Sequence, residues 1–313
     1  MTGRLRRAAL AAIPLCLGQS AAPPPRPALQ PPDASIAAGA LVVRFLTPLV
    51  QGSLVRGTAP EGTTRLLLDG QEVPLDPKRR FIIGFDRDQP AAASLEAVRP
   101  DGTLLRQRLA VARRAWDIEY INIARRPDGP TADYQKRRDV ELARIAAARA
   151  INSPTDGWEQ NFILPARGRF SGKFGSQRIY KGEPAAFHSG LDIAAGAGAP
   201  VVAPADGVVV LAGPPMLSLE GNLLIIDHGM GLNSAFLHLS TQNVRLGQFV
   251  KQGDLVGTVG STGRATGPHL HWSVKWRNAR LDPELLVKAG APRARAGPSG
   301  HPDSFREPSL MQF

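Results

Sequence analysis

Histidine is sparse in this 313-residue chain, and its distribution suggests chemistry. Five of the six histidines fall between residues 188 and 271, and the sixth, His301, is incidental. Two of them, His269 and His271, are separated by one residue in the stretch "TGPHLHWSV". Residues at alternate positions of a strand point to the same side of a sheet. Such a pair could bind a metal ion, transfer protons or fill a core.

The residues around the pair indicate which side of the strand it occupies. One face carries His269, His271 and Ser273, and the other carries Leu270, Trp272 and Val274. The apolar face is predicted to enter the core. A strand that buries three large apolar side chains has no need of a second buried face, so both imidazoles are expected to face a cleft.

A second motif supplies further metal-binding groups. A catalytic zinc ion takes three protein ligands and leaves one position for water, whose pKa it lowers to about 7. In "HSGLD", His188 and Asp192 are four residues apart, and Gly190 is expected to let the chain turn so that they converge. With one histidine of the pair they would form a His2Asp site. His238, in "FLHLS", would complete the set from an adjacent strand.

Three stretches together resemble a known family. They are "HSGLDIAAGAGAPVVAPADGVV", "IIDHGMGLNSAFLHLS" and "GSTGRATGPHLHWSV". In order, they are similar to the motifs of the lysostaphin-type (LytM-like) zinc metalloendopeptidases, which cut peptide crosslinks in bacterial peptidoglycan. The resemblance covers roughly residues 168–285. It implies a small antiparallel β barrel or sandwich with a groove across one sheet.

The resemblance also implies a role for each candidate residue. His188, Asp192 and His271 would be the ligands of one Zn²⁺ per catalytic domain. His238 and His269 would be catalytic histidines that do not bind the metal. They would hold or deprotonate the attacking water and stabilise the tetrahedral oxyanion.

The implied activity is zinc-dependent hydrolysis of peptide bonds in peptidoglycan stem peptides or crosslinks during cell-wall remodelling. Some members of the family have lost zinc ligands and regulate other cell-wall hydrolases, so a non-hydrolytic or partner-dependent regulator is the alternative. A cell-wall binding module is another. Phe236, where the family often has Tyr, and Met230, where a polar residue is usual, bear on specificity. His228 is expected to be structural and hydrogen-bonded.

The rest of the chain predicts a mainly β protein of two domains. Short β-type runs at 39–125, broken by turn signals such as Asp69-Gly70, predict an immunoglobulin-like β-sandwich. Residues 131–151, with Thr131 as N-cap, predict a charged linker helix. The peptidase domain is expected at 160–290. A Pro/Gly/Arg-rich tail at 291–313 is expected to be disordered.

The N-terminus has the layout of an export signal. Arg4, Arg6 and Arg7 precede a short apolar run, Ala8 to Leu17, so residues 1–22 are predicted to be a signal peptide, followed by a Pro-rich linker at 23–38. The run is too short to anchor the chain, so no transmembrane anchor is expected after cleavage. The only cysteine, Cys16, would be removed, which excludes disulfides and cysteine-bound zinc. The mature protein is expected in the periplasm or associated with the cell envelope.

The charge balance favours an acidic partner. The formal net charge of +11 would suit nucleic acid, an anionic membrane or an anionic cell-wall polymer. No basic-aromatic platform or recognition helix supports nucleic acid. The sequence also lacks a phosphate-binding G-x-x-x-x-G-K-[ST] loop, an HExxH helix and a G-x-S-x-G elbow. The charge does not say which acidic partner is bound. The family resemblance implies peptidoglycan as the partner, with cell-wall hydrolases or division-complex proteins as further candidates.

Overall fold

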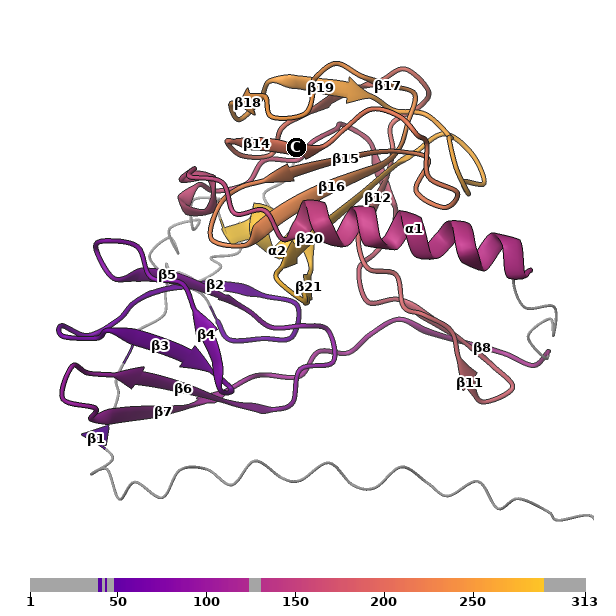
Figure 1. Cartoon of the computed structure of the whole chain (residues 1–313). Coiled ribbons are helices and arrows are strands. Elements are labelled where there is room, and N and C mark those ends of the chain that lie inside the picture. Colours follow the sequence, from indigo (N-terminus) through magenta and orange to yellow (C-terminus); the bar gives the residue numbers. More distant parts are fainter. Residues whose placement is uncertain (1–38, 41–42, 44–47, 124–130, 290–313) are drawn as a thin grey trace, which may run out of the picture. The chain divides into compact units, whose positions relative to one another are not determined.

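The computed structural model describes residues 39–40, 43, 48–123 and 131–289 (Figure 1). The described residues all belong to one compact unit of the chain. The predicted signal peptide (1–22), Pro-rich linker (23–38) and C-terminal tail (291–313) lie outside the described residues.

Strands dominate the described residues, which confirms the predicted mainly β class. The helical segments there are α1 (Ala132–Arg149), α2 (Pro283–Ala289) and a short 3-10 turn at Gly157–Glu159. Within the same residues, neither helix is long and apolar enough to cross a lipid bilayer.

The N-terminal strands form two small sheets. One has the order β1-β7-β6-β3-β4, and the other pairs β2 with β5. Their bounds are β1 Gly39–Ala40, β2 Leu54–Thr58, β3 Arg65–Leu68, β4 Gln71–Val73, β5 Arg80–Gly84, β6 Ala92–Val98 and β7 Leu104–Ala110. In β6, Ala93, Leu95 and Ala97 alternate as buried residues with more exposed neighbours, as a half-buried strand requires. The immunoglobulin-like character of this region stays a prediction.

A large sheet carries the candidate site. Its order is β18-β14-β15-β16-β20-β12-β9, with β21 paired to β20, and every pair is antiparallel. The strands are β9 Arg169–Gly172, β12 Leu191–Ala194, β14 Gly207–Leu211, β15 Asn222–Asp227, β16 Leu232–Leu239, β18 Phe249–Val250, β20 Leu270–Trp276 and β21 Ala279–Leu281. A separate sheet, β13-β19-β17, consists of β13 Pro200–Val202, β17 Thr241–Gln242 and β19 Leu255–Thr258.

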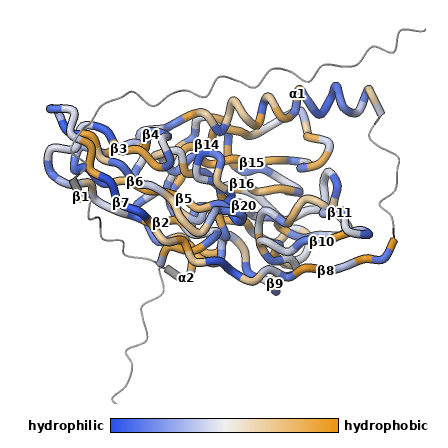
Figure 2. The backbone as a smooth tube through the Cα atoms, turned by 90° about the horizontal axis from the view of Figure 1, so that it is seen from below, coloured by the Kyte–Doolittle hydropathy of each residue, from blue (hydrophilic) through white to orange (hydrophobic). Residues whose placement is uncertain are grey.

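A fifth, small sheet joins two distant stretches of the chain. Strand β8 (Ile118–Ile121) runs parallel to β10 (Gln177–Tyr180), and β11 (Glu183–Pro184) is antiparallel to β10. Parallel neighbours need a long connection, here more than fifty residues. Strand β8, which follows the N-terminal sheets, is therefore paired with β10, which precedes the residues of the candidate site (Figures 1 and 2).

Helix α1 begins close to where it was predicted but does more than link two regions. The Thr131 side chain caps it by accepting a hydrogen bond from the backbone N–H of Tyr134. Ala148 is buried in a cluster with residues of the large sheet, including Ala235. Arg138 forms a bidentate ion pair with Glu220, at 2.5 and 2.6 Å. The helix therefore packs against the large sheet, chiefly on β14 and β15 (Figure 1).

The core follows the alternation seen in the sequence. Leu270, Trp272 and Val274 are fully buried, and His271 is partly exposed. The apolar residues concentrate in central strands such as β15 and β16 (Figure 2).

His228 is part of this core, outside the candidate site. Its Nδ1–H donates to the Asp206 carbonyl at 2.8 Å, and its Nε2 accepts from the Ser234 hydroxyl at 2.9 Å. The ring also meets Phe162 edge to face, with centroids 4.8 Å apart. Burial lowers the pKa of His228 to about 4, although the Asp206 carbonyl opposes this shift. The imidazole is therefore neutral and structural.

We predict that His228 makes the fold sensitive to acid. Its pKa of about 4 in the folded state lies below the ordinary 6.5, so its contribution is complete above pH 6.5 and is lost as pH falls towards 4. The loss in unfolding free energy should approach about 3 kcal/mol. Urea denaturation of chelator-treated protein at pH 7 and 4.5 measures it. His228→Gln should show a smaller difference, and an equal difference in both proteins would contradict the prediction.

Candidate metal centre

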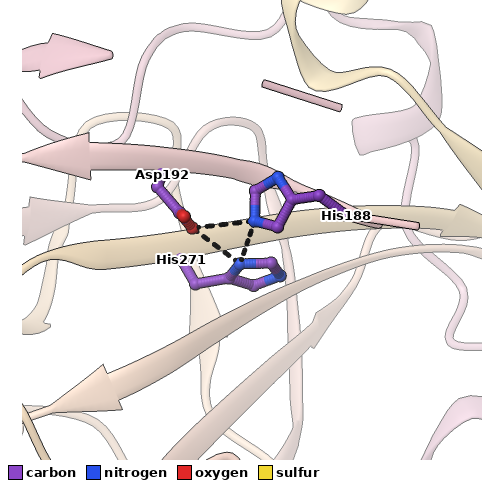
Figure 3. Close-up of side chains that lie close together, drawn as sticks. All are labelled: His188, Asp192 and His271. Carbon is purple, nitrogen blue, oxygen red and sulfur yellow. Dashed lines mark hydrogen bonds and ion pairs between the residues drawn. The ribbon is translucent and has the colours of Figure 1, made fainter. Parts of the chain in front are cut away.

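Three potential metal ligands converge at the junction of β12 and β20. Asp192 lies in β12 and His271 in β20, and the antiparallel register places them directly opposite each other. Residues opposite each other across two strands have neighbouring side chains on the same face. His188 precedes β12 and reaches the same point (Figure 3).

The distances between their donor atoms suit a tetrahedral ion. Asp192 Oδ1 lies 2.8 Å from His271 Nδ1 and 3.1 Å from His188 Nε2, and the two nitrogens are 3.1 Å apart. Ligand atoms of tetrahedral zinc are separated by about 3.3 Å, given Zn–N bonds of about 2.0–2.1 Å. Among the described residues, this is the group of His, Cys, Asp or Glu side chains that could hold a metal ion.

The orientation of His188 supports a ligand role. Its Nδ1–H donates to the Lys173 carbonyl at 3.0 Å, which leaves the Nε2 lone pair directed at the cluster. The three side chains remain 13% to 24% exposed. A catalytic zinc needs such an open position for water and substrate. The residues therefore fit zinc, both in donor type and in accessibility.

The pKa shifts show that the site strongly favours the ionised, negatively charged form of Asp192. Burial acts to raise the pKa of Asp192, but the hydrogen bonds and charges of His188 and His271 outweigh it and hold that pKa well below its usual range. Burial opposes the charge of His188 as well, yet Asp192 and the Lys173 carbonyl raise its pKa. For His271, burial dominates and lowers the pKa despite Asp192. The two rings thus share a single carboxylate.

The chain bends at Gly190, and His188 and Asp192 converge as predicted, but the bend does not use the left-handed backbone conformation. A second constraint was not predicted. A Cβ atom at Gly190 would lie 2.6 Å from Nε2 of His271 and 2.7 Å from the Trp272 carbonyl oxygen. Glycine is therefore needed because β20 passes so closely.

The two remaining histidines lie beside the cluster. Nδ1–H of His269 donates to the Gly267 carbonyl, and Nδ1–H of His238 donates to the Thr262 carbonyl, both at 2.8 Å. The two ring centroids are 4.9 Å apart, and His238 lies 6.4 Å from the His271 ring. Nε2 of His269 is 3.9 Å from Asp192 Oδ1. Among the described residues, neither Nε2 atom makes a hydrogen bond, so each ring can accept a proton there when neutral.

A β-bulge explains how His238 reaches the site. The register between β15 and β16 slips by one residue, because Leu224 faces Phe236 whereas Asn222 faces Leu239. His238 lies within this bulge at φ 65°, a conformation rare for residues other than glycine. Simple alternation would send its ring to the core face with Phe236, and bulges commonly redirect a side chain beside an active site. Burial then lowers the pKa of His238, favouring the neutral ring.

Two cavities, of about 460 and 1110 Å³, border the cluster. Both are lined by His188, Asp192, Arg264 and Thr266. The larger one is also lined by residues 116–119, which come from the chain before α1. Sequence reasoning missed this wall, because nothing in those residues signals their pairing with β10.

The two departures from the family pattern do not reach these cavities. Phe236 is fully buried in the core, and Met230 is packed against that core. Neither lines the cavities beside the cluster. The expectation that they bear on specificity therefore has no support from the lining residues.

Comparison with known proteins agrees with this geometry. Residues 186–283 match the model of peptidase family M23. A Pseudomonas aeruginosa protein assigned to peptidase M23 has a crystal structure that aligns with a TM-score of 0.59 at 32% identity, over 78% of this chain and 96% of that one. The chain belongs to peptidase family M23. Its M23 segment contains all five predicted site residues.

Curated relatives match part of the chain. Peptidoglycan DD-endopeptidase ShyB of Vibrio cholerae is 40% identical over 119 residues, which are 38% of this chain and 26% of ShyB. Cell division protein DipM of Caulobacter vibrioides is 39% identical over 132 residues, which are 40% of this chain and 21% of DipM. The chain thus spans about a quarter of the length of the curated relatives it matches.

We predict that Gly190→Ala disturbs the metal centre. The added Cβ must push His271 or the β20 backbone away, so zinc affinity should fall roughly tenfold to a hundredfold. Competition with a chromogenic chelator measures the affinity. Gly267→Ala is the matched control, because a Cβ there meets nothing within 4 Å. Equal zinc affinity in both variants would show that the close approach is unimportant.

Proposed function

We propose that the chain is a zinc-dependent endopeptidase that hydrolyses peptide bonds in peptidoglycan. The observation that carries this proposal is the convergence of His188, Asp192 and His271 beside two further histidines whose Nε2 atoms are free. Structural histidines such as His228 have both nitrogens satisfied, whereas these are poised to accept protons.

The proposed metal is held by His188, Asp192 and His271. When bound, zinc would act as a Lewis acid that polarises the scissile carbonyl and lowers the pKa of water. Asp192 supplies the negative charge that favours a cation, and the Lys173 carbonyl keeps the His188 ring in the tautomer that can bind one. The chain's part here is to orient three lone pairs at one point.

The proposed proton acceptor is His269. Its Nδ1–H is bound to the Gly267 carbonyl, so a neutral ring can accept a proton from water only at Nε2. The Asp192 carboxylate, 3.9 Å away, would stabilise the resulting imidazolium. The His238 ring is held by the Thr262 carbonyl, and its centroid lies 4.9 Å from that of His269. It is therefore placed to orient the water or the developing oxyanion.

Relatives with peptidoglycan endopeptidase activity in their names support the proposed substrate. That substrate lies outside the cytoplasm, which agrees with the predicted signal peptide and with a periplasmic or envelope location. The net charge of +11 would favour association with an anionic cell wall.

Two substitutions should separate metal binding from proton transfer. His271→Ala removes a proposed ligand, so the purified protein should contain far less than one zinc per chain and should not digest purified sacculi. His269→Ala should keep its zinc but lose roughly 10²- to 10⁴-fold in turnover. Elemental analysis and mass spectrometry of the released peptides, with an EDTA control, measure both. Full activity of His271→Ala on sacculi would refute the catalytic assignment.

A regulator of other cell-wall hydrolases is the second candidate. Similarity to a protein named as a cell division protein, DipM, agrees with a role alongside other proteins of division. The enzyme proposal predicts that His188→Ala, which loses a ligand, neither cuts sacculi nor stimulates a separate peptidoglycan amidase. Amidase activity with and without the variant tests this. Stimulation by a variant that cuts nothing would establish the regulatory role instead.

A further inference from the structure

Arg264 is a cation at the centre of the cleft. It lies in the loop between β19 and β20, five residues before His269. Besides the cluster residues His188 and Asp192, only Arg264 and Thr266 line both cavities. A substrate that extends from one cavity to the other across the cluster must therefore pass Arg264.

The backbone that carries Arg264 is held in place. Its N–H donates to the Leu219 carbonyl at 3.0 Å. Two residues earlier, the Thr262 hydroxyl donates to the Leu239 carbonyl and accepts from the Asn222 N–H, at 3.0 and 2.9 Å. The carbonyl of Thr262 is also the acceptor for His238. The loop is thus tied to the catalytic strands, while the Arg264 residue remains exposed.

The charges around the cleft leave Arg264 without a protein partner. The larger cavity has a second cation, Arg178, but this is paired with Glu119 at 2.7 Å. Asp192 is engaged by His188 and His271. Over the described residues, the guanidinium of Arg264 makes no ion pair and no side-chain hydrogen bond.

We propose that Arg264 determines specificity by binding a free carboxylate on the substrate residue that contributes the scissile nitrogen. The inference rests on the proposed endopeptidase function and names the substrate class of that site. A guanidinium recognises a carboxylate by paired hydrogen bonds in a fixed geometry.

The position of Arg264 indicates which carboxylate it binds. It lies where the two cavities meet, so its partner must be close to the reacting amide. In a peptide, the free carboxylate nearest to an amide is the one on the α-carbon attached to its nitrogen. A carboxylate there would also offset the repulsion between Arg264 and the proposed metal cation.

Matched substrates test this inference. Two crosslinked peptides are prepared that differ only at the residue contributing the scissile nitrogen, where the carboxyl group is either free or a carboxamide. The zinc-loaded full chain should favour the carboxylate by roughly tenfold to a hundredfold in kcat/KM, mainly through KM. Arg264→Gln should reduce this ratio to nearly one without loss of zinc, and Arg264→Lys should restore part of it.

The control variant is Arg245→Gln, which removes an exposed cation that lines neither cavity. It should keep the wild-type ratio. A wild-type ratio near one, or a ratio that survives Arg264→Gln, would overturn the inference while leaving the endopeptidase function intact.

Failure of the proposed function has a different signature. In that case the wild-type chain cuts neither peptide. Binding of both peptides to zinc-loaded His269→Ala, measured by fluorescence anisotropy, then decides the inference separately. If this variant binds the carboxylate peptide more tightly, and adding Arg264→Gln abolishes the difference, the inference is upheld. Equal binding of the two peptides would refute it.

Discussion

The candidate site depends on one strand pairing, that of β12 with β20. This register sets Asp192 opposite His271, so a carboxylate and an imidazole meet without help from any loop. A slip of one residue would turn His271 into the core and bring Leu270 or Trp272 to the cleft. The full burial of those two apolar side chains therefore also fixes the metal centre, because the slip would expose them to water. Gly190 adds to this constraint, because the absence of a side chain there lets β20 pass close to its backbone.

Backbone carbonyls determine what each imidazole can do. His188, His238 and His269 each donate Nδ1–H to a carbonyl oxygen and turn Nε2 towards the cleft. Main-chain acceptors cannot change protonation state, so the tautomers are set by the fold rather than by neighbouring side chains. His228 likewise donates Nδ1–H to a backbone carbonyl, but its Nε2 also accepts a hydrogen bond from the Ser234 hydroxyl. The hydrogen bond to Ser234 thus distinguishes the structural His228 from the histidines proposed to be catalytic.

Much of this arrangement follows from local sequence, and the rest does not. Alternation in "HLHWSV" predicted the buried face of β20, and Thr131 marked the start of α1 correctly. The bulge at His238 could not be predicted, because it arises from pairing with β15 rather than from its own neighbours. The cleft wall at residues 116–119 escaped prediction for the same reason, since β8 finds β10 almost sixty residues away. Patterns within a strand thus predict which of its residues are buried, whereas the pairing of distant strands determines which side chains lie next to each other.

The β8–β10 pairing means that one wall of the cleft and the candidate reactive groups come from different parts of the chain. Segment 186–283, which matches the family, contains the three candidate metal ligands and the two histidines proposed to be catalytic, but β8 and β10 lie upstream of it. One wall of the cleft is therefore encoded apart from the chemistry. Two proteins that are identical across the family segment could therefore prefer different peptides. Exchanging the upstream stretch between them would then exchange that peptide preference and leave the residues of the family segment unchanged. This wall can therefore change without altering any of the candidate ligands or proposed proton acceptors, because none of them comes from β8 or β10.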